Sequence, residues 1–262
     1  MKKYLIFGWL SCLLLLGSCG NTDELISNVS AYRLVKGETA VEINCPTGGD
    51  TAVSTMSYVY YSPADSAFKD SINEMIVDYT KAYANYQEAK NVDTISEEFF
   101  QEQLMNFASS YYEDCENGIG GVWSLDMTHN ISEYSDYVEI TMSNWVYAGG
   151  AHGNWTTSNV LMEKSSTKIL NLADFISDKE ALNTIAEPLF RELAEVDAGT
   201  DWEEAGFWFE NNEFSVNENF YFTGEAMIFD YDPYEIAPYV AGSFELAVPL
   251  SKIMHLLKRS TR

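Results

Sequence analysis

The chain has 262 residues, of which 40 are acidic and 15 are lysine or arginine, so its formal net charge is −25 at pH 7. This balance argues against nucleic acid as a partner, because proteins bind phosphates mainly through lysine and arginine. An acidic surface attracts a basic partner and speeds its arrival, although solubility alone also explains such a charge.

The first 18 residues are predicted to be a bacterial lipoprotein signal peptide. Two lysines precede the apolar run Tyr4–Leu16, which is too short to span a bilayer as a mature helix. The run ends in Leu-Gly-Ser-Cys, a lipobox pattern that would attach lipid to Cys19; the alternative is an ordinary secretory signal in which Cys19 is incidental. A multi-chain lipid anchor holds firmly at a membrane. We therefore expect a cell-envelope protein, anchored to the outer membrane on its periplasmic or surface face.

Removing residues 1–18 takes away two lysines and no acidic residue, which moves the net charge to −27. The remainder is expected to comprise a tether (19–37), an N-terminal α+β subdomain (38–136) and a C-terminal α+β subdomain (137–262). Cys45 and Cys115 remain beside the lipidated cysteine. An exported compartment permits a disulfide between them, whereas Cys115 lies on the apolar face of a predicted helix, where a buried free thiol is equally compatible.

The N-terminal half shows strand patterns at Thr39–Asn44 and Val53–Tyr61, followed by two helices. The first helix opens at Pro63, and the second follows Thr94, where Glu97 three residues later completes a capping box. Their aromatic stripes recur at helical spacing, which favours packing on a sheet over a sugar-binding platform. The stripes are Phe68, Ile72, Met75, Ile76, Tyr79, Tyr83 and Tyr86, then Phe100, Leu104, Phe107, Ala108, Tyr111 and Cys115.

The C-terminal half changes to a period of two, which is typical of strands. Because strands and helices come in blocks, the sequence predicts an α+β fold of antiparallel sheets packed with a few amphipathic helices. From Glu192 to Ser251 there are fourteen acidic residues and no lysine or arginine. The predicted strands are Val122–Asn130, Tyr137–Tyr147, Trp155–Glu163, Ile169–Phe175 (with a turn), Phe214–Phe222, Ala226–Phe229 and Phe244–Val248; the predicted helices are Ser177–Val196, with a capping box at Ser177 and Glu180, and Pro249–Lys258.

Two glycine- and tyrosine-rich turns interrupt these strands, at Tyr147–Asn154 and Asp230–Gly242. Five features in chain order resemble the extracellular module of RsiV-type anti-sigma factors, which sense lysozyme, and the accessory module of PdaC-type peptidoglycan deacetylases. They are the Tyr147–Asn154 turn, the Leu172–Phe175 turn, the Asn219–Thr223 run, the Tyr234–Gly242 part of the second turn and the Pro249 helix entry. The resemblance is specific over 137–258 and rests on element order over 38–136. The sigma-binding segment, the transmembrane helix and the metal-binding catalytic domain of those proteins have no counterpart here, so only the recognition module is implied.

Few side chains in the two turns suggest chemistry. His152 could serve as a base or metal ligand, but a hydrogen bond that braces the turn is favoured. Asp230, Asp232 and Glu235 could bind calcium or form the carboxylate pair of a glycosidase, but turn formation around Pro233 is favoured. We expect no catalytic residue, metal site or cofactor.

The turns are instead expected to lie side by side and form a recognition surface. Tyrosines there are either packed core or the residue type that stacks on sugars and anchors interfaces. The leading hypothesis is a non-catalytic envelope lipoprotein that binds a basic, lysozyme-like muramidase as an inhibitor or sensor. The alternatives are binding of cell-wall or other glycan, and an unrecognised hydrolase. The expected contact residues are Tyr147, His152, Asn154, Tyr234, Glu235 and Tyr239.

Overall fold

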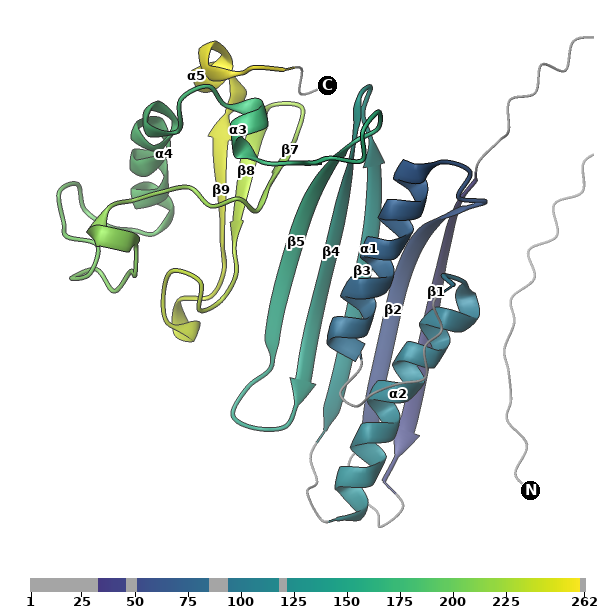
Figure 1. Ribbon diagram of the computed structural model, residues 1–262. Coiled ribbons are helices and arrows are strands. Elements are labelled where there is room, and N and C mark those ends of the chain that lie inside the picture. Colours follow the sequence, from purple (N-terminus) through teal and green to yellow (C-terminus); the bar gives the residue numbers. More distant parts are fainter. Residues whose placement is uncertain (1–32, 46–50, 85–93, 118–121, 260–262) are drawn as a thin grey trace, which may run out of the picture. The chain divides into compact units, whose positions relative to one another are not determined.

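The computed structural model describes residues 33–45, 51–84, 94–117 and 122–259. The predicted signal peptide, Cys19, Tyr86 and most of the predicted tether lie outside these ranges. The described residues form an α+β fold with a six-stranded and a three-stranded sheet (Figure 1), which confirms the predicted class. Of the described helices, none combines the length and apolar character that crossing a membrane requires.

One strand pair of the six-stranded sheet differs from the predicted antiparallel arrangement. β2 and β3 run parallel, pairing Val53–Ser57 with Ser124–Thr128. In the chain, α1 (Ala67–Ala84) and α2 (Glu97–Glu116) come between these two strands, and they return the chain to the end of the sheet where β2 began. The other neighbours are antiparallel. The strands, in spatial order, are β1 (Arg33–Asn44), β2 (Thr51–Ser62), β3 (Trp123–Glu133), β4 (Tyr137–Ala148), β5 (Asn154–Glu163) and β6 (Ile169–Leu170).

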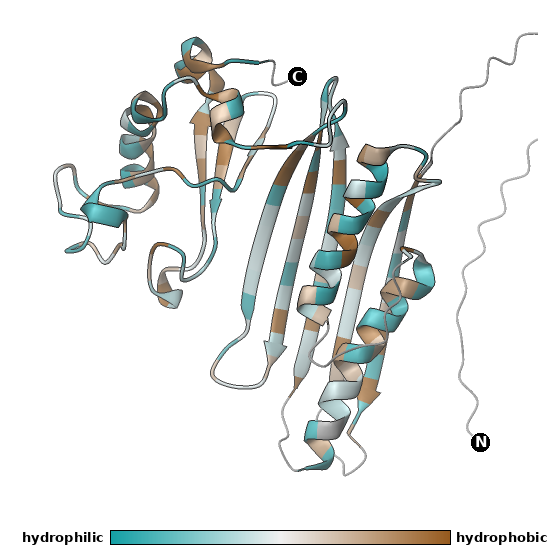
Figure 2. Cartoon of the chain, viewed as in Figure 1, coloured by the Kyte–Doolittle hydropathy of each residue, from teal (hydrophilic) through white to brown (hydrophobic). Residues whose placement is uncertain are grey.

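The two long helices cover one face of this sheet (Figure 1). The Tyr58 ring of β2 stacks on Phe100 of α2, with ring centroids 4.3 Å apart. Hydrophobic and hydrophilic segments alternate around both helices (Figure 2), and the described members of the aromatic stripes are buried in or packed against one apolar cluster. The packing interpretation of these stripes is therefore confirmed. The second helix is capped by Ser96, which accepts from the Phe99 amide, rather than by Thr94.

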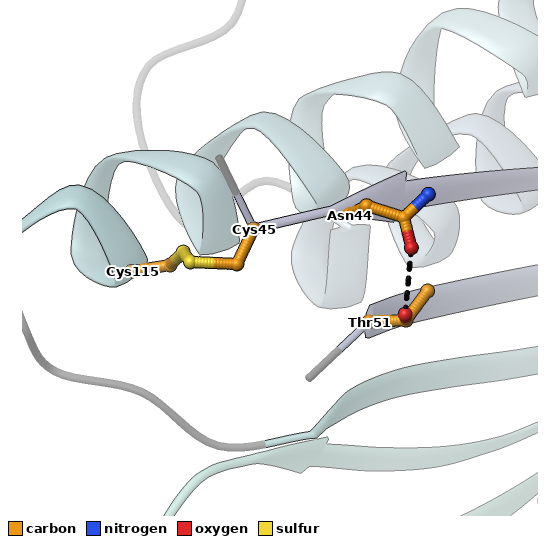
Figure 3. The surroundings of a disulfide bond; sticks show 4 residues. All are labelled: Asn44, Cys45, Thr51 and Cys115. Carbon is orange, nitrogen blue, oxygen red and sulfur yellow. Dashed lines mark hydrogen bonds between the residues drawn. A yellow bond between two sulfur atoms is a disulfide. The ribbon is translucent and has the colours of Figure 1, made fainter. Parts of the chain in front are cut away.

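Cys45 and Cys115 form a disulfide between the residue that follows β1 and the last turn of α2 (Figure 3). Their Cα atoms are 5.9 Å apart, within the range that a disulfide requires. Close by, the Thr51 hydroxyl donates to the Asn44 side chain at 2.9 Å and joins the facing ends of β1 and β2. The disulfide therefore links the edge strand of the sheet to the end of the helix that covers the sheet.

The second sheet, in order β7 (Phe220–Phe222), β8 (Ala226–Tyr231) and β9 (Phe244–Pro249), is antiparallel throughout. It shares an aromatic cluster with three helices, in which Phe190 contacts six other rings. The helices are α3 (Leu172–Phe175), α4 (Lys179–Leu193) and α5 (Leu250–Ile253), the last continuing into a 3-10 turn at Met254–Leu256.

Hydrogen bonds explain three of the predicted boundaries that are wrong in this part. The strand expected from Phe214 starts at Phe220, because the Val216 amide donates to the Asn183 side chain instead of a neighbouring strand. The closing helix stops early, because the Lys258 amide bonds to the Phe175 carbonyl. The N-cap of α4 is Asp178, which accepts from the Ala181 amide, rather than Ser177.

The two apolar clusters lie on opposite faces of the six-stranded sheet. Val138 and Ile140 of β4 belong to the cluster under α1 and α2, whereas Tyr137 and, on β5, Leu161 belong to the aromatic cluster. The predicted subdomain boundary at residue 136 thus falls inside the β3–β4 hairpin of one sheet, and residues 33–37 of the predicted tether begin β1. Both sheets share a single compact unit, residues 32–262.

The face of the large sheet opposite α1 and α2 is polar where the aromatic cluster does not cover it. Cross-strand neighbours on this face are serine, threonine, asparagine and acidic residues, together with two tryptophans. Trp145 of β4 is paired with Trp155 of β5, and their rings are nearly parallel, with centroids 5.7 Å apart. We call this region the open face; it comprises Thr55, Ser57, Asp126, Thr128, Asn130, Thr141, Ser143, Trp145, Trp155 and Thr157.

Reduction of the disulfide should destabilise the fold. The bond spans 70 residues, and a loop of that length corresponds to roughly 4 kcal/mol of chain entropy in the unfolded state. We expect urea unfolding of the protein to shift to lower midpoint on addition of a reductant. Cys45→Ser and Cys115→Ser should show the lower midpoint with or without reductant. An unchanged midpoint for reduced protein would contradict a structural role.

Candidate functional site

The first turn joins β4 to β5 and depends on glycine at two places. Gly149 and Gly150 have φ of +87° and +92°, a region that disfavours other residues, and the Tyr147 hydroxyl donates to the Gly150 carbonyl at 3.0 Å. Gly153 lies against the Trp145 indole so closely that a β-carbon would overlap the ring. The turn is therefore held against the tryptophan at the end of the open face.

His152 joins this turn to the second one. Its ring stacks on Tyr239, with centroids 3.6 Å apart and planes 15° apart. Its Nδ1 lies 2.9 Å from the Gly153 carbonyl and therefore donates, and its Nε2 lies 3.3 Å from the Tyr234 hydroxyl. The Tyr239 hydroxyl donates to the same carbonyl at 2.8 Å. The two turns thus lie side by side, and His152 braces them.

Tyr234 occupies an unusual backbone conformation. Its φ is +70°, where a bulky residue is disfavoured by roughly 1–2 kcal/mol, and its side chain is 51% exposed. The turn is fixed around it, because the Glu235 amide donates to the Asp232 carbonyl at 3.1 Å and the Asp232 amide donates to the Glu235 carboxylate at 2.9 Å. Strain held in place at an exposed aromatic side chain is a feature of functional sites.

The other two expected contact residues, Asn154 and Glu235, differ: only Glu235 has a side chain that fixes the turn. Asn154 is the first residue of β5, opposite Val146, and its side-chain oxygen is buried without a hydrogen bond within the described part of the chain. The Glu235 carboxylate also accepts from the side-chain amide of Asn217 at 2.8 Å, so both of its oxygens fix the turn. We call the exposed His152 and Tyr234, together with the half-buried Tyr239 and Tyr147, the two-turn surface.

A cavity of about 370 Å³ lies where the open face meets the three-stranded sheet. Sequence reasoning missed it, because alternation in β4 placed Glu139 on the face opposite Ile140 but could not show what that face meets. Glu245 lies in no motif, and Tyr221 belongs to the Asn219–Thr223 run, whose spacing does not place it near Glu139. The cavity is lined by Asn130, Glu139, Thr141, Trp155, Thr157 and Asn159 of the large sheet and by Tyr221, Asp230, Tyr231, Asp232, Ser243, Phe244 and Glu245.

Side-chain hydrogen bonds join the two sheets beside this cavity. The Asn159 side chain donates to Asp230 at 2.6 Å, and the Asn159 amide donates to the Asn219 side chain at 2.8 Å. Asn219 in turn donates to the Thr157 carbonyl at 2.6 Å, and the Thr157 amide donates to Asp232 at 2.9 Å. We call this network the sheet junction.

Several carboxylates at the cavity are held partly out of water. Burial raises the pKa of Asp232 to about 6, with further contributions from Glu235 and Asp230, against the lowering effect of the Thr157 hydrogen bond. Burial likewise raises the pKa of Asp230 and of Glu139. Such perturbed acids are frequent at ligand sites but also occur in structural networks. Among the described residues, no group of three or more His, Cys, Asp or Glu side chains is arranged to hold a metal ion.

Comparisons with known proteins place this fold among proteins of unknown function. Residues 173–251 match the model of the DUF3298 family, described as a protein of unknown function. Crystal structures of DUF3298 proteins are similar: one from Bacteroides fragilis NCTC 9343 (20% identity, TM-score 0.67, covering 87% of this chain and 94% of that one) and one from Pseudomonas aeruginosa PAO1 (19%, 0.55, 86% and 95%). No curated protein matches the chain. These likenesses establish a shared fold.

Gly153→Ala should destabilise the first turn, because its β-carbon would overlap the Trp145 ring. Such overpacking corresponds to about 1–3 kcal/mol, measurable as the free energy of unfolding in urea. Gly224→Ala is the matched control, since a β-carbon there meets no atom within 4 Å. Equal stability of the two variants would show that the turn does not rest on the indole.

Asp232→Asn should change how stability depends on pH. Because the folded-state pKa is raised from 3.8 to about 6, the stabilising contribution of this carboxyl is complete below pH 3.8 and lost as pH rises through 6. The amide oxygen can still accept from Thr157. At pH 7 the variant should therefore be more stable than the parent by about 1 kcal/mol, a figure reduced for solvent screening of a half-buried group, and the difference should vanish at pH 4. Glu225→Gln, an exposed carboxylate near β8, is the control; a gain equal at both pH values would contradict the assignment.

Proposed function

We propose that this chain is a non-catalytic, lipid-anchored envelope protein that binds a basic, lysozyme-like muramidase through the two-turn surface. The observation that carries the proposal is Tyr234. Its side chain is half exposed, and its backbone has a positive φ, which suits glycine. His152 of the other turn contacts its hydroxyl and so helps to fix the orientation of the ring. A partly exposed tyrosine with a fixed orientation is the residue type that anchors protein interfaces.

The charge around the second turn supports a basic partner. The turn lies within Glu192–Ser251, which has fourteen acidic residues and no lysine or arginine, so no cation of that segment opposes a positive ligand. Complementary charge steers such a partner to the surface and raises its association rate. The resemblance to the lysozyme-sensing module of RsiV-type anti-sigma factors names the class of partner.

Two observations support a place in the cell envelope. The disulfide between Cys45 and Cys115 is of a kind that persists in oxidising compartments. The lipobox at Cys19 supplies the anchor in this proposal. A binding role rather than a catalytic one is supported by His152, whose two ring nitrogens both face hydrogen-bond partners within the turns.

Tyr234→Gly tests the surface without damaging the fold. Glycine relieves the positive φ, so the free energy of unfolding should stay unchanged or rise by about 1 kcal/mol. Loss of an anchoring tyrosine should nevertheless weaken binding of purified lysozyme at least about tenfold by calorimetry. Binding should also weaken steadily as salt is raised from 20 to about 300 mM, since charge contributes to it.

Two controls make the result specific. Tyr112→Ala removes a tyrosine of α2 that is 38% exposed and should leave lysozyme binding unchanged. Cytochrome c, a basic protein without muramidase activity, should bind far more weakly than lysozyme. The proposal fails if lysozyme does not bind at low salt, or if Tyr234→Gly binds as tightly as the parent.

A further inference from the structure

The cavity between the sheets lies apart from the contacts that define the two-turn surface. None of His152, Tyr234 and Tyr239 lines it. Trp155 connects the two regions, because it lines the cavity and its ring lies edge-on to Tyr239, with centroids 5.6 Å apart. The cavity therefore requires an explanation of its own.

We propose that this cavity is a binding site for one sugar unit of a neutral saccharide chain, with the Trp145–Trp155 pair on the open face carrying the adjoining unit. The volume of about 370 Å³ falls within the range of small-molecule sites. The open face continues from the cavity along β4 and β5, which leaves room for an extended chain rather than a compact ligand.

Aromatic rings form one part of the lining. Trp155, Tyr221 and Phe244 line the cavity, and sugars place their C–H faces against aromatic rings while their hydroxyls turn to polar groups. Trp145 adds to this aromatic group: its ring stacks beside that of Trp155, with centroids 5.7 Å apart, and the residue is 37% exposed. Trp155 joins Trp145 to the cavity lining, so the exposed part of Trp145 is where the adjoining sugar unit would lie.

Hydrogen-bond donors and acceptors form the rest of the cavity lining. Asn130 and Ser243 offer donors as well as acceptors. Asp232 uses Oδ1 for the Thr157 amide, and no hydrogen bond to its other oxygen occurs among the described residues. Burial and the neighbouring Glu245, Asp230 and Glu139 raise the pKa of Tyr221 to about 12, and a side-chain hydrogen bond to Glu245 adds to this. Hydroxyl-rich ligands need this mixture.

The carboxylates determine which saccharides fit. Hydroxyl groups donate short, strong hydrogen bonds to ionised carboxylates. Glu139, Asp230, Asp232 and Glu245 all line the cavity, so a uronic acid would bring a further negative charge among them at close range. Neutral sugars are therefore accepted and acidic sugars rejected.

The site is also rigid before a ligand binds. The sheet junction fixes Asn159, Asp230 and Asp232 through hydrogen bonds of 2.6–2.9 Å that cross from one sheet to the other. A preformed site avoids the entropy of ordering side chains on binding, which otherwise offsets the weak contacts a sugar makes.

Calorimetric titration with the tetramer of N-acetylglucosamine tests the inference, and the tetramer of galacturonic acid is the charged control. The neutral tetramer should bind, and the acidic tetramer should not. Glu245→Gln, which replaces a carboxyl acceptor, and Trp145→Ala, which removes the outer tryptophan, should each weaken binding at least about tenfold. Trp208→Ala removes a tryptophan that is 52% exposed and lies outside the cavity lining, and should change binding less than about twofold.

Tyr234→Gly separates this site from the proposed protein-binding function. It should leave the affinity for the neutral tetramer unchanged even where lysozyme binding is lost. If the protein cleaves the neutral tetramer and releases new reducing ends, the sugar still binds in the cavity and the inference stands. The proposed non-catalytic function would then be wrong. The inference is overturned if the neutral tetramer does not bind, if the acidic tetramer binds equally well, or if Glu245→Gln and Trp145→Ala both bind as the parent does.

Discussion

The sheet junction is the interaction on which the rest of the structure depends. Asn159 and Thr157 of β5 exchange hydrogen bonds with Asn219, Asp230 and Asp232 beside the second sheet. Amide side chains suit this role because each donates and accepts at once. The junction sets the walls of the cavity and fixes the start of the second turn, and hence the position of Tyr234 and Tyr239 against His152.

Two features of this arrangement lower the free energy of unfolding. Carboxyl groups at the cavity are partly desolvated, as the raised pKa of Asp232 shows, and Tyr234 holds a backbone conformation that glycine would adopt freely. Large apolar clusters on both faces of the six-stranded sheet, and the disulfide at its edge, offset these losses. Strain located beside an exposed aromatic group is typical of recognition surfaces.

Periodicity predicted most of the elements, since apolar spacing in α1, α2 and β4 reflects burial directly. Periodicity gave wrong element boundaries where a single side chain sets the boundary. The Val216 amide donates to the Asn183 side chain instead of to a neighbouring strand, and Ser96 rather than Thr94 caps α2. The contact between the turns was expected from the resemblance that the two motifs share, and the stacking of His152 on Tyr239 brings them together. The cavity was not, because Glu139, Tyr221 and Glu245 are distant in sequence and converge only through the junction.

Hydrogen–deuterium exchange of the protein with and without lysozyme tests the central claim most directly, because it maps contact without altering the chain. Binding through the two-turn surface predicts slower exchange at Tyr147–Asn154 and Tyr234–Gly242 together, with α1 and α2 on the opposite face of the large sheet unchanged. Protection confined to α1 and α2, or no protection at a saturating lysozyme concentration, would contradict it.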